Sequence, residues 1–94
     1  MQSKNNYVEE ENVNKRKLLE KIYNNNKNVK FNDSITLVEA FGFILERTRG
    51  SHSIYKNYEI NKHLNLQPQK GVAKPYQIDQ FLETVQKFNL DLED

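Results

Sequence analysis

Apolar residues recur at the spacing of a helix in three stretches of the chain. The first covers about residues 13–24, where the apolar side chains fall on a single face, and the asparagine-rich run that follows is expected to end this helix. The second begins near Asn32 or Asp33, since either residue can cap exposed backbone N–H groups, and ends at Gly42, which suits a left-handed C-terminal position. The third follows Pro75, a residue well suited to the first position of a helix. The pattern therefore predicts three helices.

Between the second and third helices the pattern is that of strands. Three short strands are expected, over residues 43–48, 52–57 and 64–67. The first two are joined at Gly50-Ser51, a pair that fits a two-residue type II′ turn. A loop over residues 57–62 precedes the third strand, and a linker over residues 71–74 leads to the last helix. This order predicts an α+β fold: a three-stranded antiparallel sheet with helices packed on one face, plus an extra N-terminal helix.

The length of 94 residues is typical of one domain, and a hydrophobic share of 36% is enough for one small core. Residues 1–14 are polar and acidic, and we expect them to be a disordered lead-in to a single domain over residues 15–94. The absence of cysteine excludes disulfides, thiolate metal sites and a cysteine nucleophile. No apolar run is long enough to cross a membrane, and the first residues lack the apolar core of a secretory signal. We therefore expect a cytoplasmic protein with no membrane partner.

The formal net charge is only +1, but the charges are unevenly distributed. Residues 1–14 carry −2, residues 15–42 carry +3, residues 43–74 carry +4 and residues 75–94 carry −4. A basic middle segment suits a surface that attracts phosphate. The alternative is that the final helix simply carries solvating carboxylates, and charge alone favours that alternative.

Several sequence motifs of phosphate-binding, zinc-binding and hydrolytic sites are absent. The three glycines are isolated, so no Gly-rich loop can cradle a phosphate. The two histidines, His52 and His63, do not form a helical zinc-binding pair, and no serine lies in a nucleophile elbow. We therefore expect no metal and no cofactor.

One segment combines an imidazole with fixed positive charges. His52 directly follows the predicted Gly-Ser turn, with Arg47 and Arg49 before the turn and Lys56 after it. Histidine accepts and returns a proton near neutral pH, and arginine can hold a phosphate and offset the charge that builds on it in a transition state. In a two-residue hairpin, Arg49 and His52 face each other across the strands. The alternative is a packed or hydrogen-bonded structural histidine beside solvated arginines.

Five further residues have both a functional and an ordinary interpretation. Lys70 and Lys74 lie before the last helix and can contact RNA phosphates, or they are simply solvated. Tyr55 and Tyr58 can stack on bases, or they pack within the sheet. His63 is expected at the surface, where it can serve as a second proton carrier.

Three blocks of the sequence, taken in order, resemble the HicA family of small bacterial toxins over about residues 31–90. The blocks are Phe31-Asn32-Asp33 with Leu37 to Phe43; Gly50-Ser51-His52 with Ile54-Tyr55; and Leu64 to Pro68 with Gly71, Ala73 to Gln77, Phe81 and Leu82. The resemblance implies a double-stranded-RNA-binding-like (dsRBD-like) α-β-β-β-α fold, ribonuclease activity on messenger RNA and a cognate antitoxin of the HicB type that covers the active site. In the family the histidine of the Gly-Ser-His element is catalytic, which corresponds to His52.

The resemblance and the residues together predict the toxin of a type II toxin–antitoxin system, a metal-independent endoribonuclease with His52 as its single catalytic histidine. The residues expected to bind RNA are Arg47, Arg49, Gly50, Ser51, Lys56 and Lys74. The family often has a second histidine where this chain has Ser53, and many shorter members carry Pro-x-His where this chain has Pro68-Gln69-Lys70. These departures motivate a second hypothesis, a non-catalytic RNA-binding module, and the acidic final helix motivates a third, a protein-interaction module.

Overall fold

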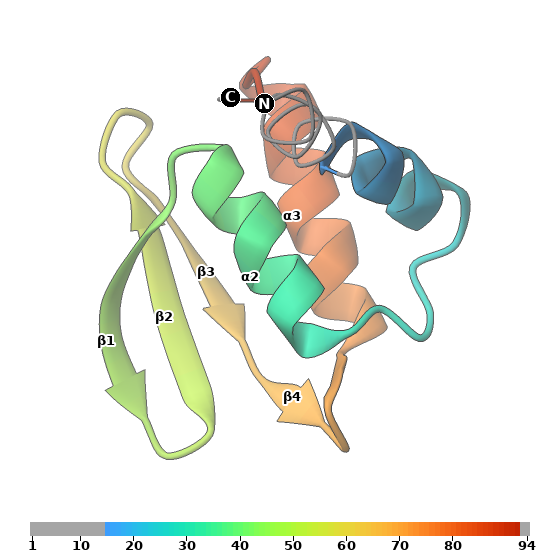
Figure 1. The fold of residues 1–94 in the computed structure, drawn as a ribbon. Helices are drawn as coiled ribbons and strands as arrows, with labels where there is room; N and C mark the ends of the chain where they lie inside the picture. Colours follow the sequence, from blue (N-terminus) through green and yellow to red (C-terminus); the bar gives the residue numbers. More distant parts are fainter. Residues whose placement is uncertain (1–14, 93–94) are drawn as a thin grey trace, which may run out of the picture.

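Residues 15–92 are described by the structure, which is a computed structural model. Along the chain the elements are a helix over residues 15–24, α2 (Phe31–Ala40), β1 (Ile44–Arg49), β2 (His52–Asn57), β3 (Lys62–Leu66), β4 (Pro68–Gln69), β5 (Val72–Ala73) and α3 (Pro75–Lys87) (Figure 1). The predicted α+β class, with three helices and a three-stranded antiparallel sheet, is confirmed. The expected start of the first helix at residue 13 and the expected lead-in over residues 1–14 lie outside the described residues.

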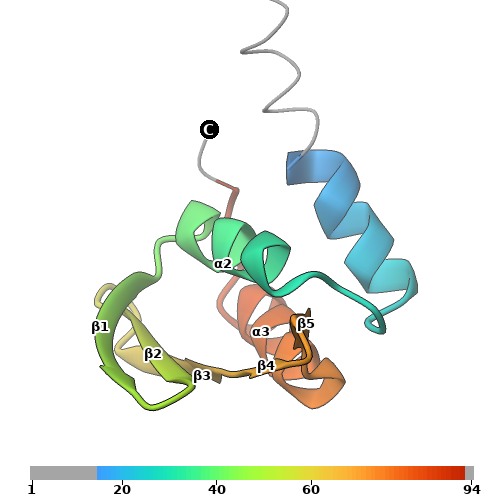
Figure 2. The same ribbon diagram turned by 60° about the horizontal axis from the view of Figure 1, so that its bottom comes forward.

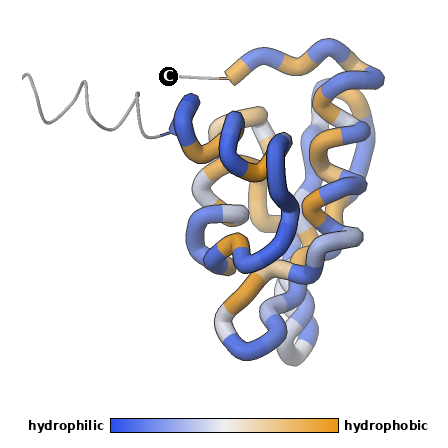
Figure 3. Tube along the Cα trace, turned by 90° about the vertical axis from the view of Figure 1, so that its right-hand side faces the viewer, coloured by the Kyte–Doolittle hydropathy of each residue, from blue (hydrophilic) through white to orange (hydrophobic). Residues whose placement is uncertain are grey.

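The helices lie on one side of the three-stranded sheet. In Figure 2, α2 and α3 lie on the same side of the three-stranded sheet, and no described helix lies on the opposite side; the edge strand β1 is exposed along its length. The helix over residues 15–24 packs farther from the sheet and contributes the buried Ile22 to the core. Hydrophilic and hydrophobic stretches alternate along this helix, as expected of a helix with one buried face (Figure 3).

Aromatic rings occupy the centre of the core, between the sheet and the helices. Phe81 of α3 and Phe43, which precedes β1, are each 1% exposed. The ring of Phe81 meets the rings of Phe41 and Phe43 edge to face, at centroid distances of 5.6 and 6.5 Å. The helical spacing predicted for α3 is confirmed, because its buried side chains include Ile78, Phe81, Leu82 and Val85.

The predicted hairpin between β1 and β2 is confirmed. Gly50 has a φ of 57°, whereas Ser51 is not among the residues with positive φ, and this combination is the one that a type II′ turn requires. A Cβ atom added to Gly50 would meet nothing within 4 Å, so the demand for glycine comes from the backbone conformation alone. The register pairs Arg49 with His52, as expected.

The predicted cap of α2 at Asn32 or Asp33 is wrong. The helix begins at Phe31, so both residues lie inside its first turn, and no side chain caps it. The backbone entering the helix is instead paired with the turn before β5, since the N–H of Phe31 donates to the carbonyl of Gly71 at 2.9 Å. Tertiary pairing therefore decides where this helix begins.

The linker expected over residues 71–74 contains β5. Strands β4 and β5 form an antiparallel ribbon, and the turn between them has φ values of 55° at Lys70 and 79° at Gly71. Two positive φ angles are typical of a type I′ turn, a conformation that lysine seldom adopts, so the sequence shows little sign of the turn. A bridge between Lys30 and Val72 extends the ribbon toward α2.

β3 begins at Lys62, two residues before the expected start, because the buried Asn57 tightens the preceding turn. The side-chain amide of Asn57 donates to the carbonyl of Phe41 at 3.1 Å, and its oxygen accepts the N–H of Glu59 at 3.0 Å. Pairing between β2 and β3 can therefore start at Asn57 and Lys62 themselves.

Candidate active site on the uncovered face of the sheet

The sheet has one face toward the helices and one face away from them. Tyr55, Leu64 and Leu66 are buried against the helices. Because side chains alternate along a strand, the residues between them in the register point the other way. We call this second surface the open face. Its members are Ile44, Arg47, Arg49, His52, Ile54, Lys56, His63 and Asn65, and the side chain of Glu46 in the β1 bulge also reaches it.

His52 is the first residue of β2 and lies on the open face beside the hairpin turn. It is partly exposed, and its Nδ1 atom lies 3.2 Å from Oδ1 of Asn65 on β3. Arg49 is its partner in the register on β1. The imidazole therefore has a neutral amide on one side and a cationic residue on the other.

Arg47 and Arg49 supply the positive charge of this end of the open face. Both are exposed, and neither side chain forms a hydrogen bond or an ion pair with another residue between 15 and 92. A guanidinium group binds phosphate oxygens through pairs of N–H donors. The two side chains are therefore available to hold a phosphate next to His52.

The other histidine is held at a different place on the open face. A bulge in β1 at Glu46 lets this carboxylate reach across the sheet, and its Oε1 lies 3.1 Å from Nε2 of His63. The hydroxyl of Tyr58 lies 3.5 Å from the second oxygen of Glu46, and Nζ of Lys56 lies 4.7 Å from the centroid of the Tyr58 ring. His63 is exposed at the surface, as expected, and its partner is a carboxylate rather than His52.

A chain of hydrogen bonds brings Lys74 to the hairpin turn. The buried Gln77 of α3 accepts the backbone N–H of Gln67 at 2.9 Å. The side chain of Gln67 then donates to Oγ of Ser51 at 3.2 Å and accepts from Nζ of Lys74 at 2.8 Å. The start of α3 and the tip of the hairpin are thereby joined, although their residues are far apart in sequence.

The expected site residues thus fall into two groups. Those that gather at the hairpin end of the sheet are Arg47, Arg49, Gly50, Ser51, His52 and Lys74. Lys56 lies farther along β2, where it pairs with His63, and Lys70 is in the separate turn between β4 and β5.

The two tyrosines considered for base stacking differ in exposure. Tyr58 is exposed, but Tyr55 is only 4% exposed and packs in the core, so the ordinary interpretation holds for Tyr55. Burial raises the pKa of the Tyr55 phenol above its ordinary value, and the negative charge of Glu39 raises it further.

This raised pKa predicts an alkaline loss of stability. The contribution of neutral Tyr55 is fully present below the ordinary tyrosine pKa of about 10 and is lost as pH rises through the raised value, because the unfolded chain gives up its proton first. Replacing Tyr55 with phenylalanine should reduce the loss of stability between about pH 8 and about pH 11, measured from urea unfolding curves. Tyr23→Phe, at an exposed position, is the control. An unchanged pH dependence in Tyr55→Phe would contradict the assignment.

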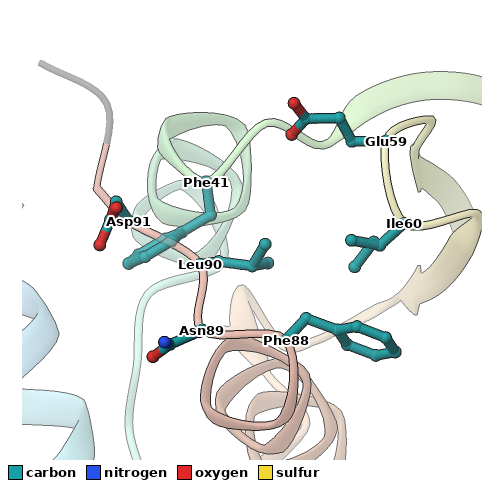
Figure 4. Close-up of a pocket in the computed structure, with 7 residues that line it drawn as sticks. All are labelled: Phe41, Glu59, Ile60, Phe88, Asn89, Leu90 and Asp91. Carbon is teal, nitrogen blue, oxygen red and sulfur yellow. The ribbon is translucent and has the colours of Figure 1, made fainter.

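The hollow drawn in Figure 4 lies away from this site. It has a volume of about 430 Å³ and is lined by Phe41, Ile60, Phe88 and Leu90, at the end of the sheet opposite the β1–β2 turn. The candidate site itself is a surface, which suits a polymer better than a small molecule. No group of three or more histidine, aspartate or glutamate side chains between residues 15 and 92 is arranged to hold a metal ion. In the same span, no helix is both long enough and apolar enough to cross a membrane.

Sequence reasoning missed the amide side chains that hold the site. The alternation Leu64-Asn65-Leu66-Gln67 indicates that the two amide side chains point to the face of the strand away from the buried leucines. It did not show which residues of β2 they meet, because the register of a strand pair depends on contacts across the sheet.

Fold and site together describe a small α+β protein with an uncovered sheet face that carries cations around one imidazole. Comparison of the chain with protein-family models, curated proteins and solved structures finds no match.

Proposed function

We propose that this protein is a metal-independent endoribonuclease that cleaves messenger RNA, as the toxin of a type II toxin–antitoxin system. The observation that carries the proposal is the position of His52, which is partly exposed on the open face beside Arg47 and Arg49. The side chains of these two arginines have no partner in the part of the chain that the structure describes. An accessible base next to free phosphate-binding groups is what strand scission of RNA requires.

The chemistry uses a nucleophile that the substrate itself provides. His52 takes the proton of a ribose 2′-hydroxyl, and the 2′-oxygen attacks the adjacent phosphorus. The bond between phosphorus and the 5′-oxygen breaks, and the leaving oxygen takes a proton from water or from the protonated imidazole. The products are a strand ending in a 2′,3′-cyclic phosphate and a strand beginning with a 5′-hydroxyl.

The cations around His52 have a shared role. Arg47 and Arg49 hold the scissile phosphate and offset the charge that develops on it. Lys74 and the Gly50-Ser51 turn contact the same strand of RNA on one side of the cut, and Lys56 contacts it on the other.

The order of elements from α2 to α3 supports a dsRBD-like arrangement, with the two helices on one face of a three-stranded sheet. A toxin with an uncovered basic face needs an inhibitor that covers it. The proposed partner is an antitoxin of the HicB type, and the proposed location of both is the cytoplasm.

A set of matched oligonucleotides tests the function. An RNA strand should be cut, whereas the DNA strand of the same sequence, and the RNA with a single 2′-deoxy sugar at the cut site, should remain intact. Cleavage should continue in EDTA and should yield 2′,3′-cyclic phosphate ends, identified by mass spectrometry. Cutting of DNA, or complete loss of activity in EDTA, would overturn the proposal.

The second candidate function is an RNA-binding module without turnover. Ser53 lies opposite the buried Leu66, on the helix side of β2, so His52 stands without another imidazole at this end of the open face. Binding of RNA that weakens steeply with salt, with no cleavage products, would favour this candidate. A pure protein-interaction module predicts no RNA affinity at all, and its basis is the acidic stretch of the last 20 residues.

A further inference from the structure

We propose that Asn65 is a positioning residue that holds His52 in the tautomer with the proton on Nδ1, so that Nε2 is the nitrogen that exchanges a proton with RNA. This inference rests on the proposed function for its consequence in catalysis. The tautomer itself is a property of the folded chain and can be measured without any substrate.

The hydrogen bond decides the tautomer. The oxygen of the Asn65 side chain can only accept, so Nδ1 of His52, at 3.2 Å, must be the donor. A neutral imidazole has one donor and one acceptor nitrogen. When Nδ1 carries the proton, Nε2 has the lone pair that a general base needs.

The strand holds Asn65 in place. Its two neighbours, Leu64 and Leu66, are buried in the core, and its partner in the register is Ile54, two residues after His52 on β2. Asn65 itself is exposed and contributes nothing to the core. Its position therefore comes from the packing of its neighbours, and its side chain can be changed without opening a cavity.

The Asn65 side chain is uncharged, and this favours the role of His52 as a base. The charged groups near His52 are cationic: Arg49 is opposite on β1, Arg47 precedes it by two residues on the same strand, and Lys74 is linked to the turn through Gln67. The carboxylate of Glu46 on the open face is bonded to His63 instead. An amide oxygen orients the ring without adding a negative charge, and a carboxylate at this place would favour the protonated imidazolium.

The same structure provides an internal reference. Nε2 of His63 lies 3.1 Å from Oε1 of Glu46, and a carboxylate oxygen accepts, so His63 carries its proton on Nε2. The two histidines of this chain are therefore expected to show opposite tautomers in one spectrum.

The test is the ¹⁵N spectrum of the imidazole rings in the full-length protein at about pH 8.5. His63→Gln assigns the two sets of signals. The wild type should show His52 protonated on Nδ1 and His63 on Nε2. In Asn65→Leu, which removes the acceptor, His52 should populate both tautomers while His63 is unchanged; Asn65→Asp keeps an acceptor and should keep the Nδ1 proton.

Kinetics then connect the tautomer to cleavage. Asn65→Leu should lower kcat by roughly tenfold with little change in KM, as expected for the loss of one orienting hydrogen bond. Asn65→Asp should restore much of kcat but move the rising limb of the pH–rate profile to higher pH, which a merely structural role would not do.

A proton found on Nε2 of His52 in the wild type, or an unchanged His52 tautomer in Asn65→Leu, would overturn the inference. The proposed function fails by a different result: RNA left intact by the wild type, or cut equally well without His52. The two failures are therefore separable.

Discussion

Replacing His52 with alanine is expected to lower the rate of RNA cleavage by about 10²–10⁴-fold, the usual contribution of a positioned acid–base group. The loss should appear mainly in kcat, because Arg47 and Arg49 still bind the phosphate. His52 is partly exposed on the open face, so the fold should survive the change. Single-turnover cleavage of a labelled RNA measures the effect.

His63→Ala is the matched control for this experiment. Its imidazole is also on the open face, but it is bonded to Glu46 and lies near Lys56 instead of the two arginines. The control should cleave RNA within a few-fold of the parental rate. Equal rates for His52→Ala and the wild type would exclude the mechanism. A larger loss of rate in His63→Ala than in His52→Ala would show that His63, and not His52, is the base.

The largest expected effect on stability comes from Phe81→Ala. Phe81 is 1% exposed and its ring contacts those of Phe41 and Phe43, so truncation removes a buried aromatic group and leaves a cavity. Such changes cost about 3–5 kcal/mol, out of a total of roughly 5–15 kcal/mol for a typical domain. The free energy of unfolding, obtained from urea titration, checks this value.

Ile44→Ala is the control for the core substitution. Ile44 is also a large apolar residue, but it is 60% exposed at the start of β1, and its truncation should change the free energy of unfolding by about 0.5 kcal/mol or less. Similar losses in the two variants would contradict the core described above. A molten Phe81→Ala protein, recognised by lost near-UV dichroism, is consistent with it.

The elements that could be predicted from the sequence are those whose causes lie within a few residues of each other. The apolar spacing of Ile78, Phe81 and Val85 predicts a helix with one buried face, whatever surface that face packs against. Pro75 favours the first turn of this helix through its own φ angle. The Gly50-Ser51 hairpin is equally local, since the turn type depends on the residue that can adopt a positive φ.

The elements that were missed depend on pairing between distant segments. The start of α2 at Phe31 and the ribbon of β4 and β5 stabilise each other through backbone hydrogen bonds, and neither has a strong local signal. Lys70 in a left-handed conformation shows the same point, because the surrounding pairing must offset an unfavourable backbone angle.

The candidate site likewise has features that the local sequence determines and features that depend on contacts between distant segments. The sequence alone determined the chemical groups and their order: an imidazole directly after a tight turn, with guanidinium groups before it, and hence His52 opposite Arg49. Only the tertiary structure decided that no helix among residues 15–92 lies over this face of the sheet and that neither arginine side chain has a partner within that span. It also decided that Asn65 and Lys74 belong to the site. The reason is physical: the nature of a side chain and a two-residue turn are local, whereas strand register and helix placement are set by the burial of Leu64, Leu66 and Phe81 in one shared core.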